Sequence, residues 1–137
     1  MAVGHLLDTS VLTRLREPSV RGAVQELMTH GSPQVSRLSC LELGFSARTA
    51  EEWREIQNAL VAFSVLEVHD DDHREALIVQ RDLADRGLRG RKLPDLLIAA
   101  TAVRVNATVL HYDRDFDLIA SVTDQPVEWI VPPGSID

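Results

Sequence analysis

The segment at residues 94–105 constrains the fold of this chain more than any other feature. It reads PDLLIAATAVRV, and Pro94 followed by Asp95 is typical of the first turn of a helix. Apolar residues follow on nearly every face of the predicted helix, whereas a helix at a protein surface carries its apolar residues on one face. We therefore expect this helix to be buried between other elements.

Short apolar runs and helical periodicities alternate along the chain. Strands are expected at residues 3–8, 34–37, 64–68, 108–110 and 127–131, the last at an edge. Helices are expected at residues 11–16, 20–30, 39–48, 49–63, 70–85, 94–105 and 115–121. This alternation favours a mainly parallel sheet covered by helices on both faces. The predicted fold class is α/β, with residues 1–137 forming a single domain.

Two serines are predicted to start helices. Ser10 is expected to cap the helix at residues 11–16, which the segment around Pro18 would end. Ser39 and Glu42 match the S-x-x-E capping box, in which the glutamate returns to the backbone N–H of the serine. We therefore expect Ser39 to open the helix at residues 39–48.

Composition indicates the compartment and the partners. The single cysteine, Cys40, excludes a disulfide within the chain and is typical of a reducing cytosol. Neither a signal peptide nor an apolar stretch of about 18 residues is evident, so we expect a soluble, cytoplasmic protein without membrane contact.

The net charge of −7 argues against broad adhesion to nucleic acid. If the chain is a nuclease, metal ions must supply much of the local positive charge.

Four acids stand at ends of predicted elements. Asp8 closes the first strand and Asp113 follows the fourth, while Glu42 and Asp95 lie in the first turns of helices. In open α/β sheets, ligands bind beyond the carboxyl ends of the strands. Carboxylates gathered there repel one another unless a cation neutralises them, and all-oxygen ligation suits Mg²⁺ or Mn²⁺.

Each acid also has an ordinary structural interpretation. Asp8 can serve as a turn or N-cap residue, and Glu42 as half of a capping box. Asp95 complements a helix dipole, and Asp113 can cap the helix that follows. Taken singly, these interpretations are the simpler ones, so the functional interpretation depends on the four acids occurring together.

The sequence motifs around the acids favour the functional interpretation. The segments LLDTSVL, S-x-x-E near residue 40, LPDLLIAATA and VLHYDRDFDLIA occur in this order and span nearly the whole chain. They resemble the acidic motifs of PIN domains, and most closely those of VapC-type toxins of type II toxin–antitoxin systems. The resemblance implies an α/β/α sandwich around a parallel sheet and Mg²⁺-dependent cleavage of RNA, with Mn²⁺ as a substitute.

The resemblance also implies roles for individual residues. The catalytic acids correspond to Asp8, Glu42, Asp95 and Asp113, and Asp115 is an additional metal-binding acid. Ser10 corresponds to a supporting hydroxyl residue. The chemistry that follows is attack on a phosphodiester by water that a bound metal activates.

The partners follow from the same resemblance. VapC-type toxins are neutralised by a co-produced antitoxin that lies across a groove and the active site, and they usually pair as homodimers. We therefore expect a VapB-like antitoxin, an RNA substrate, and both a homodimer and a toxin–antitoxin hetero-oligomer. An apolar stripe is interpreted first as core-facing, and it consists of Trp53, Ile56, Leu60 and Phe63. Alternatively, part of this stripe, with Leu12 and Leu15, lines a groove for a helix of the partner.

Basic residues near the acids are candidates for contacting RNA phosphates. Arg89, Arg91 and Lys92 precede Asp95 by a few residues, and Arg37 is a weaker candidate. An ordinary solvated loop explains the first three equally well.

The remaining histidines and aromatic residues are interpreted structurally. His69 and His73 have the spacing of two metal ligands on a helix, but the acids between them indicate a solvated helix start. Phe45, Phe63 and Phe116 lie within apolar patterns and are expected in the core.

Three alternative functions remain open from the residues alone. A phosphatase that forms an aspartyl phosphate also begins with a strand and an aspartate, but it typically carries a second acid where this chain has Ser10. A non-catalytic RNA-binding or scaffolding module of the same fold would be expected to lose one or more acids. A metal-dependent nuclease acting on DNA is chemically possible, because a metal site recognises the phosphate and not the 2′-hydroxyl.

Overall fold

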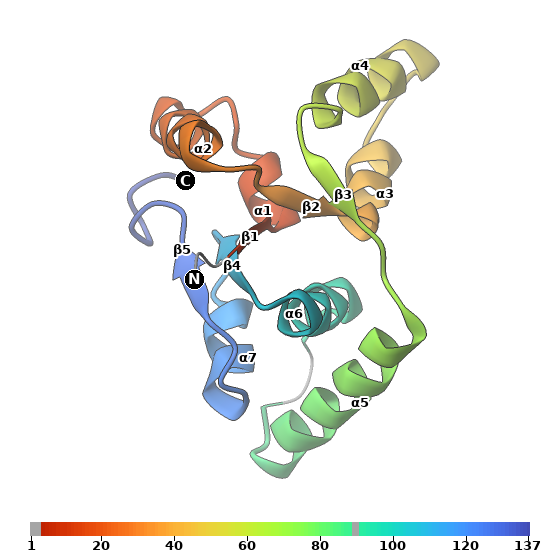
Figure 1. Cartoon of the computed structure of the whole chain (residues 1–137), viewed down its shortest axis with the longest axis vertical. Helices are drawn as coiled ribbons and strands as arrows, with labels where there is room; N and C mark the ends of the chain where they lie inside the picture. The colour runs from red at the N-terminus through yellow and green to blue at the C-terminus, as the bar shows by residue number, and fades with distance from the viewer. Residues whose placement is uncertain (1–3, 89–90) are drawn as a thin grey trace.

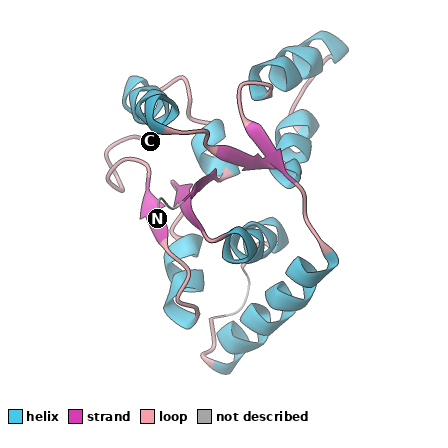
Figure 2. Ribbon diagram, in the orientation of Figure 1, coloured by secondary structure: helices cyan, strands magenta, loops and turns pink. Residues whose placement is uncertain are grey.

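The computed structural model, which describes residues 4–88 and 91–137, has a central sheet flanked by helices (Figure 2). The strands are β1 (Gly4–Leu7), β2 (Gln34–Ser36), β3 (Ser64–Leu66), β4 (Ala107–His111) and β5 (Val127–Trp129). The helices are α1 (Thr9–Leu12), α2 (Pro18–His30), α3 (Arg37–Phe45), α4 (Ala50–Leu60), α5 (Asp70–Asp85), α6 (Leu93–Val105) and α7 (Asp115–Val122).

The five strands form one parallel sheet in the order β3-β2-β1-β4-β5. The chain moves outward from β1 through β2 to β3, and it then returns to add β4 and β5 on the other side of β1. The direction of winding therefore reverses between β1 and β4. In sheets of this kind, ligands bind at that switch point, beyond the carboxyl ends of the strands.

Adjacent residues of the central strands face opposite sides of the sheet, as the pleat requires. Leu6 and Val109 pack into one apolar cluster with residues of α5, α6 and α7. Leu7 and Leu110 pack into a second cluster with residues of α1, α2, α3 and α4. Figure 1 shows these two groups of helices on the two sides of the sheet. The predicted α/β/α sandwich is therefore confirmed, with all strand pairs of the described sheet parallel.

The helix predicted from its all-round apolar character is α6, and its burial is confirmed. Seven of its residues are buried, including Asp95 and every residue from Ile98 to Ala102, although Val103 is 46% exposed. The helix packs against α5 and α7 and against β4. None of the helices in the described part of the chain has the length and apolar character needed to cross a membrane.

A buried acid on α5 joins α5 to α6. Asp72 is 1% exposed, and its side chain accepts hydrogen bonds from Nε of Arg104 (3.0 Å) and from the hydroxyl of Thr101 (3.3 Å). It also accepts from the backbone N–H of His69 (2.8 Å), so it caps its own helix. Burial alone would raise the pKa of Asp72, but the hydrogen bonds from Arg104 and its other partners lower it overall.

The predicted roles of Ser10 and Ser39 as helix caps are wrong. Asp8 caps α1, which ends at Leu12 instead of continuing to Arg16. Ser36 caps α3 by accepting from the N–H of Leu38 (3.1 Å), because β2 passes directly into the helix at Arg37.

Two further expectations are corrected by this shift of α3. Ser39 lies inside the helix with a buried side chain, so the Ser39–Glu42 capping box does not form. Glu42 is the sixth residue of α3 and does not lie in its first turn.

Pro18 begins a helix. It occupies the first position of α2, where a proline is well tolerated.

The aromatic residues divide between core and surface. Phe116 is fully buried and Phe63 packs partly against the second cluster, but Phe45 is 92% exposed, so its predicted core position is wrong. Trp53, the first residue of the predicted apolar stripe, is 49% exposed. In the rest of the stripe Leu60 is buried, and Ile56 and Phe63 are partly buried against the second cluster. Phe45 ends α3, where the apolar pattern no longer has a layer to pack against.

Candidate metal centre

A polar cleft of about 440 Å³ opens at the carboxyl ends of β1 and β4, at the switch point of the sheet. Asp8 follows β1 directly, and Asp113 lies two residues after β4. Both carboxylates line this cleft, together with Glu42 from α3 and Asp95 from α6. The four acids that the sequence analysis singled out therefore meet in one place.

Asp8 uses its two carboxylate oxygens differently. Oδ2 accepts hydrogen bonds from the backbone N–H of Ser10 (2.9 Å) and from the Ser10 hydroxyl (2.6 Å), which is the cap of α1. Oδ1 is buried and has no hydrogen-bond partner among the described residues. Burial raises the pKa of Asp8, and the nearby charge of Glu42 adds to the increase, whereas the hydrogen bonds from Ser10 oppose it. The structural and functional interpretations of this residue are thus compatible, because only one oxygen serves the cap.

Ser10 connects the ends of the two central strands. While its hydroxyl donates to Asp8, the same oxygen accepts a hydrogen bond from the backbone N–H of Tyr112 (2.8 Å), just beyond β4. The connection spans 102 residues of sequence. Ser10 therefore orients the first acid against the loop that carries Asp113.

Asp95 is the third residue of α6 and is 6% exposed. Its Oδ2 atom is buried and accepts no hydrogen bond from the described part of the chain. Burial, with the negative charge of Asp8 as the second cause, raises the pKa of Asp95 to about 7. A carboxyl group with this pKa is only partly ionised at neutral pH, and a neighbouring cation would favour its ionised form.

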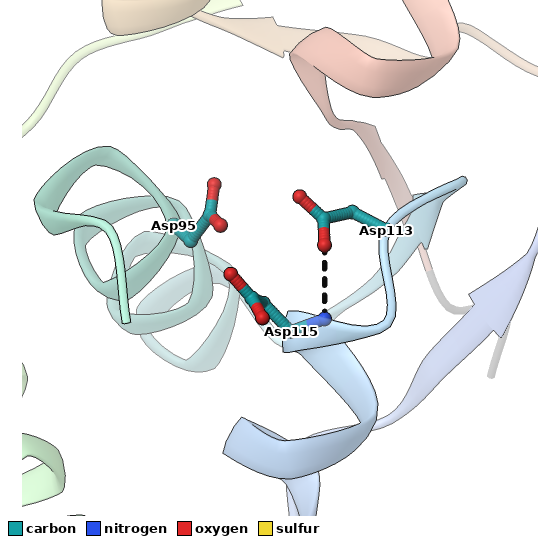
Figure 3. A group of neighbouring side chains, drawn as sticks. All are labelled: Asp95, Asp113 and Asp115. Atoms are coloured by element: carbon teal, nitrogen blue, oxygen red, sulfur yellow. Dashed lines mark hydrogen bonds between the residues drawn. The ribbon is translucent and has the colours of Figure 1, made fainter. Parts of the chain in front are cut away.

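Asp113 and Asp115 complete an acidic group with Asp95. Each of the three offers an oxygen, and these atoms lie within 4.8 Å of one another. Figure 3 shows the three carboxylates facing a common space from α6, from the loop after β4 and from the start of α7. Asp113 also accepts a hydrogen bond from the N–H of Asp115 (2.9 Å), which holds the loop in place.

Glu42 approaches the cleft from the side of α3 and is not part of this tight group. The Thr9 hydroxyl donates to Oε1 of Glu42 (2.7 Å) and lies 2.8 Å from the hydroxyl of Ser39. Thr9 was not singled out from the sequence. Its position next to Asp8 is the signal that was available, because a residue that follows a strand-end acid lies at the same edge of the sheet.

Two cations from the loop before α6 pair with the acids. Arg91 Nη1 lies 2.6 Å from Oδ1 of Asp115, and both side chains are largely buried. Lys92 Nζ lies 2.9 Å from Oδ2 of Asp113 and 3.8 Å from Oδ2 of Asp95. The hydrogen bond to Asp113 raises the pKa of Lys92. Burial alone would raise the pKa of Asp113, but the hydrogen bond from Lys92 is foremost among the contacts that lower it overall.

The other basic candidates are placed differently. Arg37 forms an exposed ion pair with Glu67, with Nη2 2.6 Å from Oε2. Arg89 lies outside the described residues. Arg14 was not predicted, yet it lines the cleft, donates to the carbonyl of Ser10 (2.8 Å) and lies over the ring of Tyr112 at 4.8 Å.

A buried histidine supports the loop that carries Asp113. His111 is the last residue of β4 and is fully buried, and its Nδ1 accepts the backbone N–H of Asp113 (3.2 Å). Burial lowers the pKa of His111, so the ring is neutral at pH 7. His69, the N-cap of α5, and His73, on α5, are exposed, and their predicted surface position is confirmed.

The chemistry of this donor set suits a hard divalent cation. All the candidate ligands are carboxylate oxygens, which Mg²⁺ and Mn²⁺ prefer. Two of these oxygens, Oδ1 of Asp8 and Oδ2 of Asp95, are buried without a hydrogen bond from any residue of the described ranges. Buried oxygens of this kind are costly unless a cation or a proton satisfies them.

Fold and site together define a doubly wound α/β protein with an acidic centre at its switch point. The family model of the PIN domain matches residues 5–122. The chain therefore belongs to the PIN-domain family, as its motifs predicted.

Curated relatives and solved structures agree with this assignment. Ribonuclease VapC51 of Mycobacterium tuberculosis is 53% identical, with 100% of each chain covered. Ribonuclease VapC21 of the same species is 39% identical, with 98% of this chain and 99% of the relative covered. Among solved structures, VapBC2 from Rickettsia felis, bound to a DNA fragment from its promoter, has a TM-score of 0.78 and 17% identity, covering 90% of this chain and 96% of the other. VapBC-1 from nontypeable Haemophilus influenzae has a TM-score of 0.75 and 22% identity, covering 92% and 97%.

Proposed function

We propose that this protein is a Mg²⁺-dependent endoribonuclease and the toxin component of a type II toxin–antitoxin system. The relatives named as VapC ribonucleases support the activity. The observation that carries the proposal is a pair of buried carboxylate oxygens, one on Asp8 and one on Asp95. Both residues line the same acidic cleft, and neither oxygen has a hydrogen-bond partner among the described residues.

Asp8 and Asp95 would be the principal metal ligands in this proposal. Asp113 and Asp115, whose oxygens lie close to that of Asp95, would provide further ligands, and Glu42 would hold a water molecule of the metal from the side of α3. When bound, Mg²⁺ or Mn²⁺ supplies a Lewis acid for the phosphate and lowers the pKa of an attacking water. Ser10 would orient the Asp8 carboxylate through the hydrogen bond to Oδ2.

The basic residues would act on the RNA backbone. Lys92 and Arg114 line the cleft with Arg14, so these three can meet phosphates that approach the acidic centre. Arg91 pairs with Asp115 and would restrain that acid. The chain has a net charge of −7, so in this proposal these three cations supply positive charge at the cleft itself.

A neighbouring apolar groove supports the proposal of an antitoxin partner. The groove has a volume of about 310 Å³ and is lined mainly by the apolar side chains of Leu12, Leu15, Leu43, Ile56, Leu60 and Phe63. Thr13 lines both this groove and the acidic cleft, so the two lie next to each other. A VapB-like antitoxin that lays an amphipathic helix in the groove would therefore extend into the catalytic centre. A homodimer that binds antitoxin as a hetero-oligomer belongs to the same proposal.

The test is RNA cleavage by the full chain, purified free of antitoxin. Total cellular RNA and a matched single-stranded DNA would be incubated with the protein in Mg²⁺, in Mn²⁺ or in EDTA. The Asp8→Asn and Asp95→Asn variants test the centre, and Asp124→Asn, at an exposed position, is the matched control.

Discrete cleavage of RNA that requires the metal and both aspartates would support the proposal. Cleavage of DNA alone would replace it with a DNA-directed nuclease. If folded wild-type protein that binds the metal leaves transfer, ribosomal and messenger RNA intact, the catalytic proposal is refuted and a non-catalytic RNA-binding module becomes the better explanation.

A further inference from the structure

Lys92 is the only lysine in the chain, and the other 13 of its 14 basic residues are arginines. Its ammonium group reaches into the acidic centre from the residue that precedes α6. An ammonium is a compact point charge on a flexible stem, unlike the planar guanidinium of arginine. The chain thus places its single lysine at the position where the carboxylates converge.

The ammonium of Lys92 faces oxygens that a metal would also bind. Its Nζ lies 2.9 Å from Oδ2 of Asp113 and 3.8 Å from Oδ2 of Asp95, the buried oxygen that no described residue hydrogen-bonds. Asp95 and Asp113 are also two of the three acids whose oxygens lie within 4.8 Å of one another. A divalent ion held between these two acids would meet the positive charge of Lys92 at close range.

The side chain of Lys92 is 62% exposed, whereas those of Asp95 and Asp113 are 8% and 21% exposed. The lysine can therefore move into water at little cost, but the two acids cannot. When a divalent cation takes the place of Lys92, the two acids keep a cationic partner, so the release of the lysine leaves no buried charge unpaired.

We propose that Lys92 is a built-in competitor of the metal ion, occupying the site between Asp95 and Asp113 and leaving it when the metal binds. The proposal rests on the metal-dependent function proposed above. Lys92 keeps the acids of the metal-free protein neutralised, and it sets the metal concentration at which the site fills. The displaced ammonium stays close to the cleft, where it can meet a phosphate of the substrate.

The first test compares metal affinities by calorimetry, using metal-free full-length protein and Mg²⁺ or Mn²⁺ alone as the probe. Removing a unit positive charge about 4 Å from a divalent ion in water-like surroundings is expected to strengthen binding by up to about thirtyfold in Lys92→Met. Lys92→Arg retains the charge and should stay within about threefold of wild type. Arg54→Met makes the same charge change at an exposed position of α4 that does not line the cleft, and it should leave the affinity unchanged.

The second test follows Lys92 itself in the wild-type protein. Reductive methylation with ¹³C-formaldehyde preserves the charge and labels only Lys92 and the amino terminus, because the chain has no other lysine. Saturation with Mg²⁺ is expected to move the dimethyl-lysine NMR signal toward its position in the urea-unfolded protein, because the displaced ammonium is surrounded by water.

Each outcome separates this inference from the proposed function. Equal metal affinity in wild type and Lys92→Met, or a lysine signal that Mg²⁺ does not move, would overturn the competition and leave the metal-dependent nuclease standing. Metal binding by neither protein would overturn both. Tighter binding in Lys92→Met together with a shifted signal would establish the competition.

Discussion

Replacing Asp95 with asparagine should make the metal-free protein more stable. Asp95 is 6% exposed, one of its oxygens has no hydrogen-bond partner in the described chain, and the charge of Asp8 acts on it. The substitution keeps the size of the side chain and removes the charge. We therefore expect a gain in stability from a substitution that the proposed function predicts to abolish RNA cleavage.

The pKa of Asp95 gives the magnitude. It is raised from 3.8 to about 7 in the folded protein. Between these two values the folded chain holds a proton that the unfolded chain has released, so stability decreases as the pH rises through this window. At about 1.4 kcal/mol for each unit of pKa difference, the ionised carboxylate costs about 4 kcal/mol at pH 8. At pH 5 the corresponding cost is about 2 kcal/mol.

Urea denaturation in EDTA at pH 5 and pH 8 measures this effect. Asp95→Asn should exceed wild type by up to about 2 kcal/mol at pH 5 and up to about 4 kcal/mol at pH 8. These are upper values, because the buried amide also needs hydrogen-bond partners. Mg²⁺ should stabilise wild type and have little effect on the variant, since the variant lacks one of the two proposed principal ligands.

The control is Asp124→Asn, which makes the same chemical change at an exposed position and should stay within about 0.5 kcal/mol of wild type at both pH values. If Asp95→Asn were no more stable than wild type at pH 8, or if its advantage failed to grow with pH, Asp95 would not be a destabilising buried carboxylate. The argument for a cation at this position would then lose its energetic basis.

Three further predictions concern the surroundings of the centre. Ser10→Ala removes the hydroxyl that joins Asp8 to the N–H of Tyr112, so it should cost about 1–3 kcal/mol in urea denaturation and weaken Mg²⁺ binding in calorimetry. Asp72→Asn breaks the buried pair with Arg104 and should cost about 3 kcal/mol, while the affinity for Mg²⁺ is retained; a loss below about 1 kcal/mol would contradict this interpretation. Mg²⁺ at 100 times its dissociation constant should raise the free energy of unfolding by about 2.7 kcal/mol, and EDTA should reverse the gain.

The sequence determined most of the local elements and identified the acids that meet in the cleft. The helix at Asp70–Asp85 has the predicted bounds, and the buried helix α6 starts one residue before the prediction, because helical periodicity and first-turn acids are local signals. Asp8 and Asp113 could be assigned to one edge because the carboxyl ends of parallel strands share that edge. The start of α3 was predicted wrongly because two nearby serines, Ser36 and Ser39, are both suited to cap a helix. The structure shows that Ser36 is the cap.

Only the tertiary structure decided which side chains meet across the sheet. The hydrogen bond from Tyr112 to Ser10 joins residues 102 positions apart, and no pattern along the chain selects such a pair. The pairing of Lys92 with Asp113 and the pKa of Asp95 likewise depend on how deeply the packed layers bury each group. Periodicity reports which residues can face inward, whereas burial and electrostatic coupling arise only when distant elements pack together, so the acids could be predicted from the sequence and their energetics could not.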